Sequence, residues 1–232
     1  MNVLNKKSPT SVKGAELVTR RQDEILEKAA SFFSQHGYPN ADMQSLANEL
    51  SIGKGTLYRY FPSKEELFFA AADRGMRLLH EFIETERDHK ADPLEQIRLA
   101  IRLFFRFFDN HPQYLELLIQ ERAEFRDRRE PTYVKHREAN SCDYDELTRT
   151  LFESGRLREL PSKHLEETIN NMLYGTLFTN YFARQNTSFE DRAEEVVNVI
   201  FCGVLSESER AKMLHTIETN HNESMTNQPS SR

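Results

Sequence analysis

Apolar residues recur three and four positions apart along most of this chain, and this spacing limits the fold to α-helices. The pattern is clear in residues 94–108, which follow an Asp92-Pro93 helix start, and again in residues 189–204. All eight prolines fall at breaks in the pattern or near the chain ends. No segment shows strand alternation or an Asn-Gly hairpin. We therefore predict an all-α protein with about nine or ten helices.

The chain is long enough to bury a substantial core. Its 232 residues, 38% of them hydrophobic, fit one large domain or two small ones. The longest apolar runs end at Asp73 or are interrupted by Arg106, well short of the roughly 20 residues of a membrane helix. The N-terminal segment lacks the apolar stretch of a secretory signal, and two cysteines do not make a disulfide framework. We predict a cytoplasmic protein without membrane contact, with Cys202 in the core and Cys142 exposed.

The charges are unevenly distributed along the chain. The net charge is −6, yet residues 1–21 hold five basic residues against one acidic residue. A basic arm ahead of an acidic body is typical of a protein that binds nucleic-acid phosphate at one end. A charged N-terminus is also often only a solvated tail, so this feature does not decide the function.

The segment SIGKGTLYRYFPSKEEL, residues 51–67, carries the most chemical information. Its GKGT run invites two nucleotide-binding interpretations, and both fail. A P-loop needs Ser or Thr directly after the lysine, but Gly55 follows Lys54. A dinucleotide fingerprint needs a third glycine where Tyr58 stands. Neither motif would follow a strand here, so we exclude nucleotide binding by this segment.

Helix signals around this segment predict two short helices joined by a tight turn. Asp42 is a good N-cap for a helix over 43–50, residues 51–52 form the turn, and Gly53 caps a helix over 54–61. Ser63 and Glu66 form a capping box that starts a long helix reaching about His89. This is the arrangement of a helix-turn-helix that enters the major groove of DNA. A surface helical hairpin with solvated charges fits the same signals.

Lys64 favours the DNA interpretation. It lies in the first turn of its helix, where the helix dipole disfavours a cation. A DNA phosphate would bind both the free N–H groups of that turn and the lysine. Tyrosines beside lysine and arginine also suit phosphate contact.

Residues 17–67 resemble the DNA-binding domain of the tetracycline-repressor (TetR) family. The resemblance rests on Leu46-Ala47, on GTLYRYF at 55–61 and on SKEEL at 63–67. Two positions depart from the family pattern: Ser51 stands where glycine is frequent in the turn, and Gly53 replaces a frequent serine N-cap. A positive φ at Ser51 would cost up to about 1 kcal/mol.

The resemblance implies that residues 54–60 are the recognition helix. Lys54, Thr56 and Arg59 are then candidates for base edges or nearby phosphates, and Arg59 has the geometry to pair with guanine. Gly55 leaves room for another backbone. The remaining candidate DNA contacts are phosphate contacts: Tyr58, Tyr60, Lys64 and, more weakly, Gln44.

The resemblance further implies four parts: a flexible basic arm (1–16), the helix-turn-helix domain (17–67), a helical effector-binding and dimerisation domain (68–217) and a disordered tail (218–232). The domains would share the helix that begins at Ser63. Gly155 is a plausible helix stop, and apolar faces on the helices after Ser162 and Phe189 suit a four-helix dimer interface. The candidate interface residues are Leu165, Ile169, Met172, Leu173, Val196, Val197, Ile200 and Val204. Burial inside one subunit fits the same pattern.

An effector pocket has a weaker signal. The helix over 93–109 is apolar nearly all round, so we expect it to be central. The candidate pocket residues are Phe104, Phe108, Tyr114, Met172, Tyr174 and Phe178, although such aromatics are also ordinary core residues. Arg98, Arg102 and Arg106 form a polar stripe that suits either an ion-paired surface or an anionic effector.

The resemblance implies a bacterial transcriptional regulator, usually a repressor, that binds a palindromic operator as a homodimer and is released by a small-molecule effector. An enzyme is the alternative class, but no catalytic or metal-binding motif is present, and we expect no cofactor. A second alternative is a DNA-binding protein of this type controlled by a protein partner. The charged run ERAEFRDRRE (121–130) suits such a partner or a solvated helix end.

Overall fold

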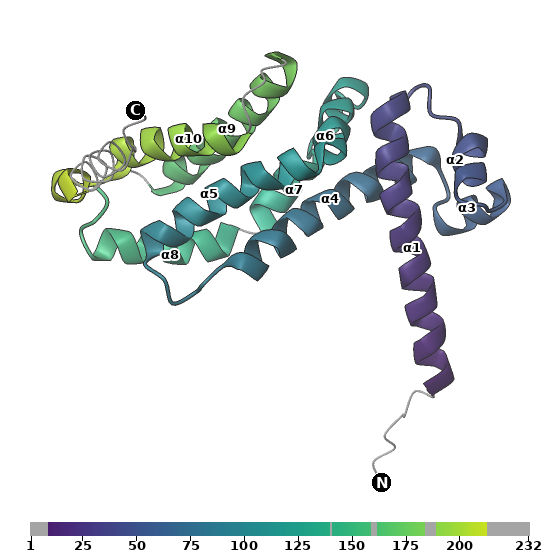
Figure 1. Cartoon of the computed structure of the whole chain (residues 1–232), viewed down its shortest axis with the longest axis horizontal. Coiled ribbons are helices and arrows are strands. Elements are labelled where there is room, and N and C mark those ends of the chain that lie inside the picture. Colours follow the sequence, from purple (N-terminus) through teal and green to yellow (C-terminus); the bar gives the residue numbers. More distant parts are fainter. Residues whose placement is uncertain (1–8, 140, 159–161, 184–188, 213–232) are drawn as a thin grey trace, which may run out of the picture. The chain divides into compact units, whose positions relative to one another are not determined.

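The computed structural model describes residues 9–139, 141–158, 162–183 and 189–212 (Figure 1). These residues form helices joined by short loops, and the only β-type pairing among them is an isolated antiparallel bridge between Leu157 and Leu205. The all-α prediction is confirmed. The helices are α1 (Pro9–His36), α2 (Met43–Glu49), α3 (Lys54–Tyr60), α4 (Lys64–Glu86), α5 (Pro93–Asn110), α6 (Pro112–Glu124), α7 (Thr132–Ala139), α8 (Ser141–Glu153), α9 (Ser162–Ala183) and α10 (Phe189–Val204).

The described residues divide into two compact units. The first contains the residues up to Glu81 together with Asn110–Glu138, and the second contains Phe82–Asp109 with the residues from Ala139 onward. The long helix α4 contributes to both, as the capping box at Ser63 predicts. The first unit therefore holds α6 and most of α7 in addition to the predicted helix-turn-helix.

Local signals set the helix ends of the first unit. Gly37, with φ of 75°, ends α1, and the Ser63 hydroxyl accepts a 3.0 Å hydrogen bond from the Glu66 N–H at the start of α4. Helix α1 begins at Pro9, inside the segment 1–16 that we expected to be a flexible arm. Proline is well tolerated in the first turn of a helix, and no further proline interrupts the chain before Pro39. Residues 1–8 and the predicted tail 218–232 lie outside the described residues.

Helix α6 packs against α1 and completes the core of the first unit (Figure 1). Phe33 and Phe68 are fully buried and meet edge to face, with ring centroids 5.2 Å apart. Helices α4 and α6 approach closely at Gly75 of α4. A Cβ built there would lie 2.6 Å from Cγ of Tyr114 on α6, and only 3% of Tyr114 is exposed. The Tyr114 hydroxyl also accepts a hydrogen bond from Arg74.

The second unit is built around α5. Leu103, Phe105, Phe107 and Phe108 of this helix are at most 2% exposed, as expected for a central helix. Helices α9 and α10 pack against each other in the same unit. The residues after α8 are fixed by Arg156, which forms ion pairs with Asp92 and, at 2.9 Å, with Glu209.

The prediction that Cys202 belongs to the core is wrong, because its side chain is exposed. Val197, Ile200 and Phe201 of α10 are buried, whereas Val199 is 60% exposed. Cys202 lies one helical turn from Val199 and therefore shares its outward side. Cys142 lies among the residues whose side chains the structure does not describe.

Among the described residues, no helix is both long and apolar enough to cross a membrane.

Candidate nucleic-acid interface

The helix-turn-helix is formed by α2, a tight turn and α3. The Asp42 carboxylate caps α2 by accepting the backbone N–H groups of Gln44 at 2.9 Å and Ser45 at 3.0 Å. These hydrogen bonds, that of Ser45 first, together with the charge of Lys54, hold the pKa of Asp42 below its ordinary value. Gly53 caps α3 in an extended conformation, without a side-chain hydrogen bond. Both predicted caps are confirmed.

Ser51 occupies the turn in a left-handed conformation. Its φ of 54° is the only positive value at a non-glycine among the described residues. The backbone accommodates it because the N–H of Ile52 donates to the carbonyl of Ala47 at 3.0 Å. The positive φ on which the expected cost depends is therefore present at Ser51.

Replacing Ser51 with glycine is expected to stabilise the protein. Glycine adopts positive φ without the steric cost of a Cβ, and the expected gain is up to about 1 kcal/mol, reduced by the greater freedom of the unfolded chain. Chemical denaturation of both proteins measures it. Ser45→Gly is the matched control: Ser45 lies inside helix α2, so glycine there should destabilise. Equal losses in both variants would contradict strain at Ser51.

Three buried side chains hold the two short helices on the core. Leu46 and Ala47 of α2 are fully buried, and Leu57 of α3 is 1% exposed. The first two belong to the Leu-Ala pair that the resemblance rests on. Because α3 spans only seven residues, this packing rather than intrinsic helix stability keeps it folded.

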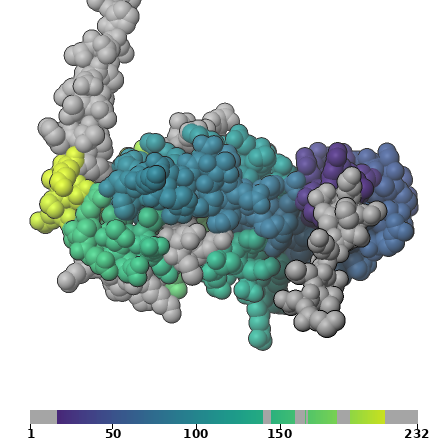
Figure 2. Space-filling view, turned by 90° about the horizontal axis from the view of Figure 1, so that it is seen from below, coloured from purple at the N-terminus to yellow at the C-terminus, as the bar shows by residue number. Residues whose placement is uncertain are grey.

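The opposite side of these helices presents most of the candidate DNA contacts. Gln44, Lys54, Gly55 and Arg59 are exposed, and the remaining candidates are partly exposed: Thr56, Tyr58, Tyr60 and Lys64. In the space-filling view, the coloured atoms of α1, α2 and α3 lie together in a purple-to-blue area (Figure 2). No atom lies within 4 Å of a Cβ built on Gly55, so this glycine leaves open space on the exposed side of α3.

Lys64 is held in place beside this surface. Its Nζ donates to the carbonyl of Pro39 at 3.1 Å and lies 4.8 Å from the centroid of the Tyr38 ring. Burial lowers the pKa of Lys64, and the nearby charge of Asp42 opposes this effect. Burial also raises the pKa of Tyr38. A lysine fixed in this way is suited to a phosphate, because less side-chain entropy is lost on binding.

Sequence reasoning missed two buried polar residues of α6, and the first of them supports this surface. The Gln120 side chain accepts the Tyr38 N–H at 2.9 Å and donates to the Phe33 carbonyl at 3.0 Å, so α6 fixes the loop that positions Lys64. Glu121 is 1% exposed, although it begins the charged run 121–130. Its position three and four residues after Leu118 and Leu117, on the apolar side of the helix, is the signal that would have placed it inside.

The candidate pocket residues are not all brought together. Phe104, Tyr174 and Phe178 lie in the second unit. The distance between ring centroids is 5.3 Å for Phe104 and Tyr174 and 6.1 Å for Tyr174 and Phe178. Phe108 joins them at 5.3 Å from Phe104. Tyr114 belongs to the first unit, where it packs on Gly75. Met172 on α9 is partly exposed.

The candidate dimer residues are also divided. Those that are largely buried inside the subunit are Leu173, Val196, Val197 and Ile200, which is the alternative that the pattern left open. Those that remain partly exposed are Leu165, Ile169, Met172 and Val204. The arginine stripe is at least partly ion-paired, because Glu194 of α10 pairs with Arg102 and lies 3.8 Å from Arg98.

Comparison with known proteins identifies the first unit. The family model for bacterial regulatory proteins of the tetR family matches residues 25–71. The transcriptional repressor AcnR of Corynebacterium diphtheriae is 36% identical over 98 residues, which are 40% of this chain and 51% of AcnR. The nucleoid occlusion factor SlmA of Vibrio vulnificus is 27% identical over 157 residues, or 65% of this chain and 76% of SlmA.

The fold is also shared with solved structures. The structure of AibR in complex with isovaleryl coenzyme A and operator DNA superposes with a TM-score of 0.59 and 22% identity, covering 78% of this chain and 98% of AibR. The chain spans about half the length of the first curated relatives it matches. The matched segment and the helix-turn-helix that it forms show that residues 25–71 are a DNA-binding segment of the type found in bacterial regulatory proteins of the tetR family.

Proposed function

We propose that this protein is a ligand-responsive transcriptional regulator, acting as a repressor, that binds a palindromic operator as a homodimer. The observation that carries the proposal is the surface of α2 and α3, where a capped helix pair presents Lys54 and Arg59 to solvent beside a fixed Lys64. A helix-turn-helix dimer reads two half-sites about one DNA turn apart, which accounts for a palindromic operator.

The outward side of α9 and α10 supports a dimer. Phe182 is 66% exposed, Val199 is 60% exposed and Tyr181 is 37% exposed, in the same helix pair as the exposed Cys202. These side chains lie on two helices that pack against each other, and burial of exposed apolar surface favours association. In this proposal a second copy covers them, while Val197 and Ile200 remain in the core of each subunit.

The second unit supports an effector site. The aromatic side chains of Phe104, Tyr174 and Phe178 come from two helices that pack in one unit, as in an apolar ligand site. AibR, with a similar fold, was solved with a coenzyme A thioester and operator DNA together. We therefore propose that a small-molecule effector binds here. Its binding favours a spacing of the two helix-turn-helix units of the dimer that does not fit the operator, so the operator is released.

Selection of bound DNA from a random pool tests this proposal. The expected result is an enriched sequence with two inverted half-sites. A pool that stays unenriched after repeated rounds would overturn it, and enrichment of a single half-site would overturn the dimer. Added isovaleryl or stearoyl coenzyme A then shows whether an acyl thioester releases the selected operator.

Arg59→Ala and Lys64→Ala are expected to weaken operator binding in different ways. Loss of a two-pronged contact with guanine should cost about 1–3 kcal/mol at one base pair and relax sequence preference there. Loss of a phosphate contact at Lys64 should weaken binding to all sequences alike. It should also reduce the slope of the logarithm of affinity against the logarithm of salt concentration by about one. Fluorescence anisotropy at several salt concentrations measures both. If both variants bound the selected operator like the wild type, these contacts would be assigned wrongly.

A second candidate is a DNA-binding protein controlled by a protein partner. It is favoured by the similarity to SlmA, which is described as a nucleoid occlusion factor and shows a longer overlap with this chain than AcnR. A thermal-shift screen against metabolites separates the two. Stabilisation by a metabolite that also releases the operator favours the first candidate, and a protein that binds the DNA-bound form without any metabolite response favours the second.

A further inference from the structure

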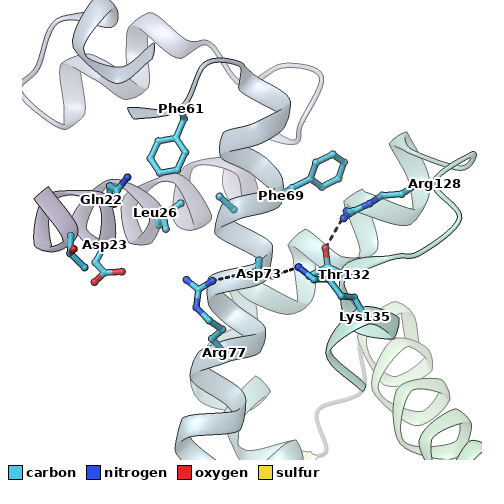
Figure 3. A pocket seen from close by; sticks show the side chains of 12 residues that line it. Gln22, Asp23, Leu26, Phe61, Phe69, Asp73, Arg77, Arg128, Thr132 and Lys135 are labelled. Carbon is cyan, nitrogen blue, oxygen red and sulfur yellow. Dashed lines mark hydrogen bonds and ion pairs between the residues drawn. The ribbon is translucent and has the colours of Figure 1, made fainter. Parts of the chain in front are cut away.

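A cavity of about 440 Å³ opens in the first unit, between helices that are distant in sequence (Figure 3). Helices α1, α4 and α7 form its walls, together with Phe61 at the end of α3 and Arg128 in the loop before α7. Its volume lies within the range of about 300–1,000 Å³ that is usual for small-molecule sites. All the lining residues belong to the first unit, so the cavity is distinct from the aromatic cluster around Phe104.

One part of the lining is apolar. Leu26 of α1, Phe61 and the ring of Phe69 on α4 line the cavity together with the small Ala70. Leu26 is 6% exposed, while both phenylalanines are only partly buried and keep exposed ring surface. Apolar surface of this kind favours a ring or a branched hydrocarbon group.

The other part of the lining is charged, and Asp73 is at its centre. The Asp73 carboxylate accepts hydrogen bonds from Arg77 and, at 3.3 Å, from Lys135 (Figure 3). It also accepts one from Nε2 of His136 at 2.8 Å. Burial of Asp73 works against its ionisation, yet the hydrogen bond from His136 and the positive charges around it hold its pKa below the ordinary value. This carboxylate is therefore already surrounded by donors. The second carboxylate of the lining, Asp23, lies 3.8 Å from Arg74 of α4.

Arg77 and Lys135 have hydrogen-bonding capacity that Asp73 does not use. Their side chains are 49% and 57% exposed, and Asp73 is the only described residue that pairs with either. A guanidinium carries five N–H donors and an ammonium carries three. Arg128 differs, because Glu121 pairs with it and its guanidinium stacks 4.0 Å from the centroid of the Phe69 ring. The cations available to a ligand are thus Arg77 and Lys135, from two different helices.

We propose that this cavity binds a small organic carboxylate that carries an aromatic or branched aliphatic group. The carboxylate lies between Arg77 of α4 and Lys135 of α7, and the apolar group packs on Phe61, Phe69 and Leu26. Such a ligand would link α1, α4 and α7 and touch the residue that ends α3. Binding itself does not depend on the proposed operator contacts.

Calorimetry on the full chain without DNA tests the site, with phenylacetate as the probe. Acetate and benzyl alcohol, at matched ionic strength, supply the carboxylate and the ring separately. The expected result is saturable binding of phenylacetate at millimolar concentration or below, and at least about tenfold weaker binding of either part. Inorganic phosphate binding as tightly as phenylacetate would overturn the apolar part of the proposal, and no saturable heat with phenylacetate would overturn all of it.

Single-residue variants test whether phenylacetate binds in this cavity. Arg77→Ala and Lys135→Ala should each raise the dissociation constant by about tenfold. Ala70→Leu fills the cavity without removing a charge and should abolish binding. Arg129→Ala removes an exposed arginine next to Arg128 that does not line the cavity, and it should bind like the wild type.

Thermal melting without ligand shows which variants are folded. If Ala70→Leu does not fold, Ala70→Val takes its place as the smaller filling substitution. Folded Arg77→Ala and Lys135→Ala proteins that bind phenylacetate like the wild type would overturn the placement of the carboxylate. Operator binding measured with and without phenylacetate then tests the proposed regulatory function separately, because calorimetry without DNA has already decided the site.

Discussion

Replacing Glu121 with alanine is expected to lower the free energy of unfolding by about 3 kcal/mol, one of the two largest effects we predict for a single side chain. The Glu121 carboxylate is buried, accepts the N–H of Thr132 at 2.9 Å and pairs with Arg128. Alanine would leave this N–H without an acceptor at the start of α7, in a residue that is 2% exposed. Arg128 is 30% exposed, so water would compensate part of its lost partner, and we therefore place the effect at the lower end for a buried pair.

Urea denaturation of Glu121→Ala, Glu121→Gln and Glu124→Ala measures this effect. Glutamine keeps an oxygen for the Thr132 N–H but loses the charge opposite Arg128, so an intermediate loss of about 1–2 kcal/mol is expected. Glu124 is an exposed residue one turn further along α6, and its replacement should change stability by less than about 0.5 kcal/mol. If alanine at 121 and at 124 had the same effect, the role of Glu121 in fixing α7 would be refuted.

Replacing Gly75 with alanine is expected to destabilise the protein by about 2 kcal/mol, although the same change usually stabilises a helix by about 1 kcal/mol. The added Cβ would lie 2.6 Å from Cγ and 3.0 Å from Cβ of Tyr114. These atoms are close to the α6 backbone, and the Tyr114 hydroxyl accepts a hydrogen bond from Arg74. The Tyr114 side chain therefore has little freedom to move away. Helices α4 and α6 would have to separate.

Gly55→Ala is the matched control, since no atom lies within 4 Å of a Cβ at that position. It should gain up to about 1 kcal/mol of stability while weakening operator binding, if Gly55 leaves room for the DNA backbone. Tyr114→Ala combined with Gly75→Ala removes both sides of the clash, and the double variant should lose clearly less than the sum of the single losses. Additive losses would show that the two residues do not restrict each other.

The helix-turn-helix followed from the sequence because its signals are local. Asp42 caps α2, Gly155 follows the end of α8, and the Ser63 hydroxyl accepts the Glu66 N–H, all as predicted. Each of these involves hydrogen bonds or dihedral angles within a few residues, which neighbouring side chains fix directly. The start of α1 at Pro9 was not predicted, because a charged amphipathic segment is compatible with a helix and with a solvated arm alike.

The candidate interface was only partly visible in the sequence. The exposed positions on α3 could be named from the helical period once Leu57 was placed in the core. The support of Lys64 by Pro39 and Tyr38, and of Tyr38 by Gln120, joins residues up to 82 positions apart. Long-range contacts of this kind leave no periodic signal in one sequence, so they appeared only in the structure.

The sequence by itself determined the helical architecture, the N-caps of α2 and α3 and the turn between them, because backbone geometry there depends on adjacent side chains. Only the tertiary structure decided which apolar and charged residues meet. It placed Tyr114 on Gly75, buried Glu121, turned Cys202 outward and left a cavity beside Asp73. An amphipathic helix specifies which face is buried but not which helix covers it, and that choice rests on the fit of whole surfaces.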